Sequence, residues 1–242
     1  MVLRIRVRLP DRPGSLGKVA RILGAAGADV VQMAVLERDS GRALDDFTVA
    51  WPTGAGIERL CEGLASVPGV EVVGIWPTLE PPGTNQDATL IGQLAAARED
   101  AGLAILTDAV PAMLSADWAG LVRIEQGIEQ GIGQEEAAGA VLVHTSLGVF
   151  GGIEVPPLEP LRPRAFTAED GTRYALVPIG GGELALLVAR TGAPPFHRSE
   201  VLRLAELVNA AEAVLGQRVR ALPEPALRPD PAVITPSGGS SS

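Results

Sequence analysis

The sequence predicts an α+β protein in which a ferredoxin-like β-α-β-β-α-β unit is followed by a second α+β unit. Three observations predict this class. Residues 1–77 show strand-like alternation and helix-like spacing of apolar residues in that order. Residues 78–87 are rich in Pro and Gly and read as a linker. Residues 88–217 carry a second series of such patterns, and residues 218–242, which end in Ser237-Gly238-Gly239-Ser240-Ser241-Ser242, are expected to be a disordered tail.

The first strand is predicted at residues 3–9, where apolar residues alternate with Arg4, Arg6 and Arg8. A period of two places the apolar side chains on one face of a sheet and the arginines on the other. The arginine row either faces solvent or lines the sheet interface of a dimer, and the pattern favours neither.

The first helix is predicted to begin near Pro13, because Pro suits the first turn of a helix, where no N–H is needed. Leu16, Val19 and Leu23 form its apolar stripe. Gly27 offers a stop for this helix.

The rest of the first unit is predicted as strands at 29–37, 43–51 and 70–75, with a helix that opens at Pro52-Thr53-Gly54 and ends at Pro68-Gly69. The adjacent acids Asp45 and Asp46 interrupt the third strand and are expected to form a turn or a bulge. In this topology both helices cover one face of a four-stranded antiparallel sheet. The other face is left open, and its simplest cover is a second copy of the chain.

The second unit begins with helical patterns and ends with a long helix. Gly180-Gly181-Gly182 is predicted to be the turn of a hairpin. The short repeat at 125–133 is expected to be a hairpin loop, and the Pro- and Gly-rich residues 147–170 read as irregular. Helices are predicted at 88–98, 99–115 and 199–215, and strands at 118–125, 139–146, 173–179 and 183–189.

Composition and charge exclude several classes of function. The net charge of −9, with no basic patch beyond the arginine row, opposes direct binding to nucleic acid or to an anionic membrane. No apolar run reaches the ~18–20 residues needed to cross a bilayer. No signal peptide precedes the first strand, so the expected location is cytoplasmic. Cys61 is the single cysteine, which excludes a disulfide within the chain and a zinc site built on paired thiolates.

The first unit resembles the ACT domain family. The resemblance rests on the strand Leu3–Leu9, the loop Asp11-Arg12-Pro13-Gly14-Ser15-Leu16, and the segment Gly27-Ala28-Asp29-Val30. ACT domains typically show D-R-P-G-x-L between the first strand and the first helix, and that helix then ends in G-x-n-I/V. The resemblance implies that two domains pair through their sheets and that an amino acid is bound near the interface.

The second unit resembles the GAF domain over residues 88–217. The resemblance rests on Arg173–Ile179, Glu183–Ala189 and Phe196-His197-Arg198-Ser199-Glu200. It implies a GAF-like α/β/α domain with an antiparallel sheet. The N-K-x-x-x-F-x-x-x-D-E pattern of cyclic-nucleotide sites is absent, and this unit contains no cysteine to attach a bilin, so the resemblance indicates no particular ligand.

The loop before the first helix is the candidate ligand site. A helix that starts near Pro13 leaves the N–H groups of the next residues without intrahelical partners, and the helix dipole adds partial positive charge there. Such an end suits the carboxylate of an amino acid. The predicted ligand-binding residues are Asp11, Arg12, Pro13, Gly14, Ser15, Leu16, Asp29, Val30 and Gln32, the last three being expected near the same end of the sheet.

Asp11 is expected to bind the ammonium group of the ligand, and Gly14 lets a ligand approach the backbone closely. The alternative is that Asp11 only caps the helix and that Pro13-Gly14 is an ordinary turn.

No pattern predicts a catalytic residue, a metal or a cofactor. Cys61 lies on an apolar stripe, and the isolated His144 and His197 lack partners at metal-ligand spacing. Residues 147–170 contain no nucleophile–base pair. We therefore expect a non-catalytic sensor that is a homodimer and binds a small molecule such as an amino acid. Its signal is expected to be a change in how the two domains, or a partner protein, pack. The alternative is a dimerisation or interaction module that binds no ligand.

Overall fold

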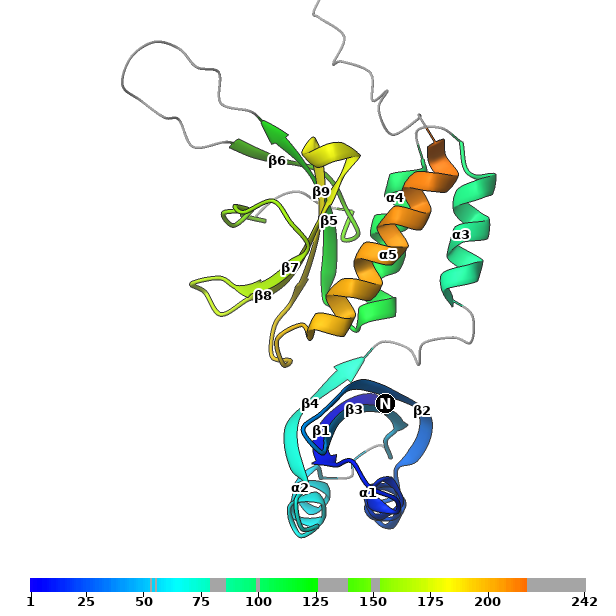
Figure 1. Cartoon of the computed structure of the whole chain (residues 1–242), viewed down its shortest axis with the longest axis vertical. Helices are drawn as coiled ribbons and strands as arrows, with labels where there is room; N and C mark the ends of the chain where they lie inside the picture. The colour runs from blue at the N-terminus through cyan, green and yellow to red at the C-terminus, as the bar shows by residue number, and fades with distance from the viewer. Residues whose placement is uncertain are drawn as a thin grey trace, which may run out of the picture.

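The computed structural model describes residues 1–52, 54, 56–78, 86–98, 101–125, 139–148 and 153–216. In these residues the chain forms two antiparallel sheets, each with its own core (Figure 1). We call residues 1–78 the first domain and residues 86–216 the second domain. Most of the predicted linker, the predicted loop after Glu125 and the predicted tail lie outside the described residues.

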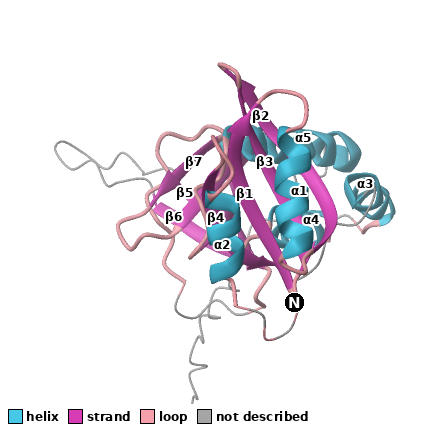
Figure 2. Cartoon of the chain, turned by 90° about the horizontal axis from the view of Figure 1, so that it is seen from below, coloured by secondary structure: helices cyan, strands magenta, loops and turns pink. Residues whose placement is uncertain are grey.

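The first domain has the predicted β-α-β-β-α-β order, with both helices on one face of the sheet (Figure 2). The strand order in the sheet is β2-β3-β1-β4. The elements are β1 (Val2–Pro10), α1 (Ser15–Ala25), β2 (Asp29–Asp39), β3 (Arg42–Ala50), α2 (Glu58–Ala65) and β4 (Glu71–Thr78).

The core of the first domain lies between its helices and its sheet. β1 and β3 pair from Val2↔Ala50 to Pro10↔Arg42, so alternate residues of the two strands share a face. The buried apolar side chains of this face are Leu3, Ile5, Val7, Leu9, Phe47 and Val49 from the strands, and Val19, Leu23, Leu60 and Leu64 from the helices.

Two helices begin later than the sequence predicts, and in both places a glycine with positive φ precedes the helix. α1 begins at Ser15 rather than near Pro13, because Gly14 has φ 86° and serves as the N-cap. α2 begins at Glu58 rather than at Pro52, after a turn in which Gly54 has φ 80°. A left-handed residue cannot be part of a right-handed helix, so each helix starts after its glycine.

The second domain contains a five-stranded antiparallel sheet with the strand order β6-β5-β9-β8-β7. The α+β class and the antiparallel sheets are therefore confirmed. The elements are α3 (Gln86–Ala96), α4 (Gly102–Leu114), β5 (Trp118–Glu125), β6 (Gly139–Thr145), β7 (Arg164–Thr167), β8 (Arg173–Ile179), the short 3-10 helix η1 (Gly180–Gly182), β9 (Leu184–Arg190) and α5 (Arg198–Leu215).

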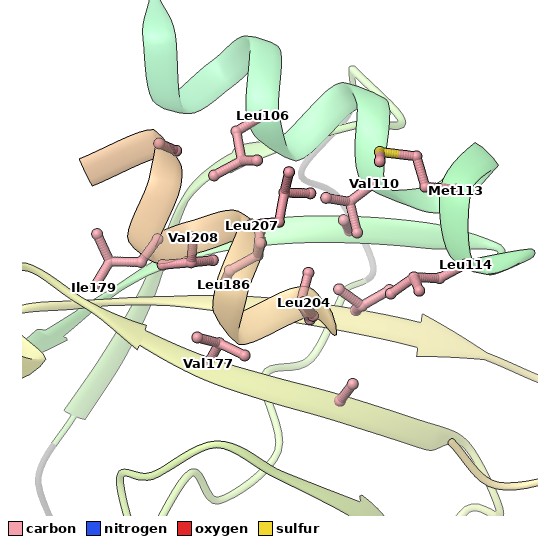
Figure 3. Packing of buried hydrophobic residues seen from close by; sticks show 14 of the residues in the cluster. Leu106, Val110, Met113, Leu114, Val177, Ile179, Leu186, Leu204, Leu207 and Val208 are labelled. Atoms are coloured by element: carbon pink, nitrogen blue, oxygen red, sulfur yellow. The ribbon is translucent and has the colours of Figure 1, made fainter. Parts of the chain in front are cut away.

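The main core of the second domain lies between one face of this sheet and its helices. Figure 3 shows α4 and α5 directing apolar side chains onto β8 and β9. The labelled members of this core are Leu106, Val110, Met113 and Leu114 from α4, Leu204, Leu207 and Val208 from α5, and Val177, Ile179 and Leu186 from the strands.

The opposite face of this sheet is covered by non-helical chain. Leu158, with Val155 and Leu161, packs on it from a segment that the sequence predicts to be irregular. The same segment also contains β7, a four-residue strand that was not predicted and that pairs with β8. The second helical layer of an α/β/α arrangement is therefore not among the residues that the structure describes.

The open face of the first sheet packs against the second domain of the same chain. The first turn of α5 and the residues before it lie over this face (Figure 1). A side chain at Gly74 of β4 would collide with the ring of Pro194, so glycine permits this close approach. The expectation that a second copy covers this face is therefore wrong, and intramolecular packing takes its place.

Arg6 connects the two domains. Its Nε and Nη2 donate to the two carboxylate oxygens of Asp46 at 2.7 and 2.8 Å, and Nη2 also donates to Oε2 of Glu200 at 2.8 Å. Arg190 donates to both oxygens of Glu200 at 3.2 Å and stacks on Phe196 at 3.8 Å. These ionised side chains are all almost fully buried, so each depends on the others for compensation of its charge.

The predicted arginine row divides between the interface and solvent. Arg4 lies in the interface, where its Nε is 3.0 Å from Asp46 and its Nη1 donates to Ser115 of the second domain. Arg8 is 44% exposed and lies 3.8 Å from Glu71. The solvated alternative holds for Arg8, whereas Arg4 and Arg6 fit neither alternative, because they bind carboxylates at a contact within one chain.

The interface shifts the acidity of its groups. Burial opposes the charged form of Glu200, but Arg190 and Arg6 outweigh it and lower the pKa of this carboxyl to about 2. Burial also opposes the charged guanidinium of Arg6, and the hydrogen bonds and charges of Asp46 and Glu200 outweigh it and raise the Arg6 pKa. Both groups therefore remain ionised at neutral pH.

Replacing Glu200 by Gln should destabilise the protein strongly. The variant leaves Arg6 and Arg190 buried with one carboxylate fewer, a change that costs about 3–5 kcal/mol in comparable buried pairs. Equilibrium urea unfolding measures the loss. Glu206→Gln, on the exposed side of the same helix, is the matched control and should change stability by less than about 0.5 kcal/mol. Equal losses in the two variants would contradict this account of the interface.

The contribution of Glu200 should also depend on pH. Its pKa is lowered from 4.5 to about 2, so its stabilising effect is complete above pH 4.5 and is lost as the pH falls towards 2. The difference in unfolding free energy between the wild type and Glu200→Gln should therefore be constant above about pH 5 and shrink by about 3 kcal/mol in acid. A difference that does not change between pH 6 and pH 2.5 would rule out the assigned pKa.

Candidate ligand site at the start of the first helix

The loop between β1 and α1 is held by backbone hydrogen bonds. The N–H of Asp11 donates to Gly41 at 2.8 Å, and the N–H of Ser15 donates to Arg12 at 3.2 Å. Gly14 adopts φ 86°, which other residues rarely adopt, and a Cβ there would meet no atom within 4 Å. The glycine is therefore required by the turn, and the space beside it is open.

The first turn of α1 is not capped by a side chain. Among the described residues no side chain accepts a hydrogen bond from the N–H groups of Leu16 or Gly17, and the first helical bond runs from Lys18 to Gly14. Asp11, the alternative cap, lies instead 3.8 Å from Arg38. The free amides of Leu16 and Gly17 lie further along the chain than predicted, because the helix begins at Ser15, and the dipole argument applies to them unchanged.

A pocket lies beside this turn. Its volume is about 170 Å³, many times the space that one water needs. Arg12 and Lys18 give it positive charge. The lining residues are Pro10, Arg12, Pro13, Ser15, Lys18, Val67, Pro68 and Val70, so the turn between α2 and β4 supplies a wall that was not predicted.

Asp45 is an unpaired buried carboxylate on the helix face of the sheet. It lies in the middle of β3, opposite Val7 and Val35, and is only 3% exposed. Its Oδ1 has no hydrogen-bond partner among the described residues. Burial raises the pKa of Asp45, Arg38 opposes this, and Asp11 and Asp46 add to it, so the Asp11 loop is close enough to act on this carboxylate.

The expected turn or bulge at Asp45-Asp46 is absent from β3, which pairs with β1 without interruption. The bulge lies in the neighbouring strand β2, between Val35 and Glu37. Asp45 was therefore missed as a site residue. The sequence did show an acidic residue inside an otherwise apolar strand. Such a residue indicates either a break in the strand or a strand residue with a polar role.

The predicted site residues fall into two groups at opposite ends of the sheet. The loop of Asp11, Arg12, Pro13, Gly14, Ser15 and Leu16 follows Pro10, whereas Asp29 pairs with Ala50, which also pairs with Val2. Eight residues of strand, about 26 Å at 3.3 Å per residue, separate the two ends. The expectation that Asp29, Val30 and Gln32 lie near the loop is wrong within one chain, because α1 returns the chain to the start of β1 before β2 begins.

The edge strand β2 exposes apolar residues beside this site. Met33 and Val35 lie on the helix face of the sheet and are 37% and 41% exposed, and Leu16 of α1 is 38% exposed. Val30 and Val31 are also exposed on this strand. An eleven-residue edge strand of this kind presents unpaired backbone groups and apolar side chains together.

The other candidate residues have structural contacts. His197 caps α5 by accepting from the N–H of Ser199, and its Nε2 lies 3.4 Å from Glu37 of the first domain. Nε2 of His144 lies 2.8 Å from Asp108. In the described part of the chain no three His, Cys, Asp or Glu residues are grouped to bind a metal. Within the same part, none of the helices has the length and apolar character needed to span a membrane.

Comparison with solved structures gives only distant similarities. A formyltetrahydrofolate deformylase from Pseudomonas putida KT2440 is 14% identical with a TM-score of 0.28, and the match covers 38% of this chain and 36% of that one. The regulatory subunit of aspartate kinase from Thermus thermophilus is 15% identical over 90% of this chain and 91% of that one, with a TM-score of 0.29. The GAF domain of an Acinetobacter phosphoenolpyruvate-protein phosphotransferase is 12% identical over 59% of this chain and 99% of that one, with a TM-score of 0.40.

A sequence family model matches part of the first domain. No curated protein is significantly similar to the chain in sequence. The family model of the ACT domain matches residues 3–50, which comprise β1, α1, β2 and β3 and so include the loop, Asp45 and the exposed edge strand. The first domain therefore has both the sequence and the fold of an ACT domain.

Proposed function

We propose that this chain is a non-catalytic regulatory protein that binds an amino acid at the start of α1, in an ACT domain that works as a homodimer. Two observations carry the proposal: the uncapped start of α1 beside a pocket of about 170 Å³, and the buried Oδ1 of Asp45, which has no hydrogen bond among the described residues. An amino acid zwitterion has a carboxylate that can accept hydrogen bonds from the free N–H groups of α1 and an ammonium that can donate one to Asp45.

The chemistry of the two ends of an amino acid supports this assignment. The carboxylate suits the free N–H groups of Leu16 and Gly17, where the helix dipole adds partial positive charge. The ammonium suits Asp45 and Asp11, two carboxylates whose charges act on each other. A charge-assisted hydrogen bond to Asp45 would remove the penalty of its unmade bond. The apolar surface of Leu16 and Val35 suits a hydrocarbon side chain.

The edge strand supports a dimer in which β2 pairs with β2 of a second copy. Antiparallel pairing reverses one strand, so the start of the partner's strand meets the loop end of the first. Asp29 of the partner subunit would then lie near the Asp11 loop, together with the partner's Val30 and the partner's Gln32. Each site would be completed by both protomers, and the two groups of predicted residues would come together only across the dimer.

The second candidate function is a dimerisation module without a ligand. The exposed apolar edge of β2 favours it, because strand pairing by itself buries Met33 and Val35. The two functions differ in whether any small molecule stabilises the protein, which the following experiment measures.

A thermal-shift screen of the twenty amino acids should identify at least one that raises the Tm. A ligand at one hundred times its Kd adds about 2.7 kcal/mol, or roughly 5–10 °C for a chain of this size. Asp45→Asn should weaken binding of that amino acid about tenfold to hundredfold, because a hydrogen bond to a charged group is lost.

Glu62→Gln, an exposed change on α2, is the control for this screen and should bind as the wild type does. If no amino acid raises the Tm, the ligand-free module becomes the better description. If Asp45→Asn binds as tightly as the wild type, Asp45 has no place in the site.

Replacing Val35 by Lys should convert the dimer to a monomer. A charge on the pairing edge opposes strand addition, since Lys on an edge strand is a common protection against it. Size-exclusion chromatography with light scattering measures the mass. Val73→Lys, on the opposite edge strand β4 and similarly exposed at 38%, should leave the mass of the dimer unchanged. A dimer that survives Val35→Lys and is lost with Val73→Lys would place the interface at the other edge.

A further inference from the structure

Two adjacent carboxylates of β3 face different parts of the molecule. Asp45 pairs with Val7 on the helix face, and Asp46 pairs with Arg6 on the face that packs on the second domain. Side chains of neighbouring strand residues point to opposite faces, and their Cα atoms are about 3.8 Å apart. One short piece of backbone therefore belongs to both the ligand site and the domain interface.

Asp46 begins a continuous series of contacts that ends at α5. It accepts two hydrogen bonds from Arg6, at 2.7 and 2.8 Å. Arg6 in turn donates to Glu200 at 2.8 Å, and the same Oε2 accepts from the N–H of His197, the N-cap of α5, at 2.7 Å. These groups are closely packed and almost fully buried, so a shift of Asp46 changes the contacts that fix the first turn of α5.

Asp45 occupies the other end of the series, and the charge of Arg38 is the only positive charge found to act on it among the described residues. Its Oδ1 is buried without a hydrogen bond. The negative charges of Asp46 and Asp11 add to the effect of burial in raising the pKa of Asp45, and the positive charge of Arg38 opposes them. The carboxylates of Asp45 and Asp46 thus repel each other across the backbone of β3.

We infer that binding of a cationic group at Asp45 strengthens the contact between the two domains, through Asp46, Arg6 and Glu200. The inference rests on the proposed function, because it describes the regulation of the same site. The cation removes the repulsion of Asp46 and fixes β3 where Asp46 meets Arg6. By linkage, the docked second domain increases the affinity of the site by the same factor.

Hydrogen exchange of the ligand-free protein tests this coupling. Asp45→Asn removes the charge of Asp45 as a bound cation would, and keeps the shape of the side chain. The N–H groups at the start of α5, residues 200–203, should exchange about fivefold more slowly in this variant, the lower end of typical coupling between sites. Arg38→Gln, at an exposed position, should have the opposite effect and speed their exchange about twofold, because it removes the charge that offsets Asp45.

Two controls make the result specific to this route. Glu62→Gln should leave exchange in α5 unchanged. Adding Asp45→Asn to Glu200→Gln should also have no effect on α5, since the connection is already broken there. The inference is overturned if Asp45→Asn alters exchange in β3 and leaves α5 as in the wild type, or if its effect on α5 persists in the Glu200→Gln background.

The outcome is separate from that of the amino acid screen. If Asp45→Asn slows exchange in α5 but no amino acid raises the Tm, the proposed ligand is refuted and the coupling through Asp46, Arg6 and Glu200 is supported. A bound amino acid without coupling would keep the ligand and refute the route.

Discussion

The contact of Arg6 with Asp46 and Glu200 is the constraint on which the arrangement of the two domains depends. A guanidinium removed from water must be compensated fully, and one carboxylate comes from the first sheet and one from α5. Arg190 supplies the second cation that Glu200 needs. The open face of the first sheet is consequently covered by the second domain of the same chain.

The sequence predicts the order and approximate bounds of nearly every element, because alternation and helical spacing are local properties. The partner of Arg6 is not local: Glu200 lies 194 residues away, and nothing near Arg6 in the chain indicates it. Alternation at residues 3–9 correctly separates two faces but does not say what covers either. β7 was missed for a related reason, since four residues are too few to show a period and pairing with β8 decides their conformation.

The candidate site was predictable where it depends on local chemistry. The residues Pro13-Gly14-Ser15 indicate a turn followed by the start of a helix, and the ACT resemblance includes the same loop. The local signal for Asp45 is an acid inside an apolar strand, which does not distinguish a break in the strand from a buried strand residue. The wall formed by Val67 and its neighbours depends on how elements pack and has no local signal. The predicted position of Asp29 was wrong because α1 runs back along the sheet. β2 therefore starts beside the start of β1, at the end of the sheet far from the loop. Under the proposed function this placement constrains the oligomer, since only a second chain can bring Asp29 to the loop.

The four-stranded sheet then has three separate uses on three sides. The helix side and loop end carry the proposed ligand site, the edge strand β2 is exposed and is proposed to pair with a second copy, and the open face packs on α5. β3 touches all three, since it pairs with β2, carries Asp45 towards the helices and carries Asp46 towards the second domain. A change in its position cannot be confined to one of them, because packed interiors transmit displacement. Two acidic side chains next to each other in a buried strand cost stability, and the inferred coupling gives them a role: the strand responds to charge on one face and changes the contact on the other.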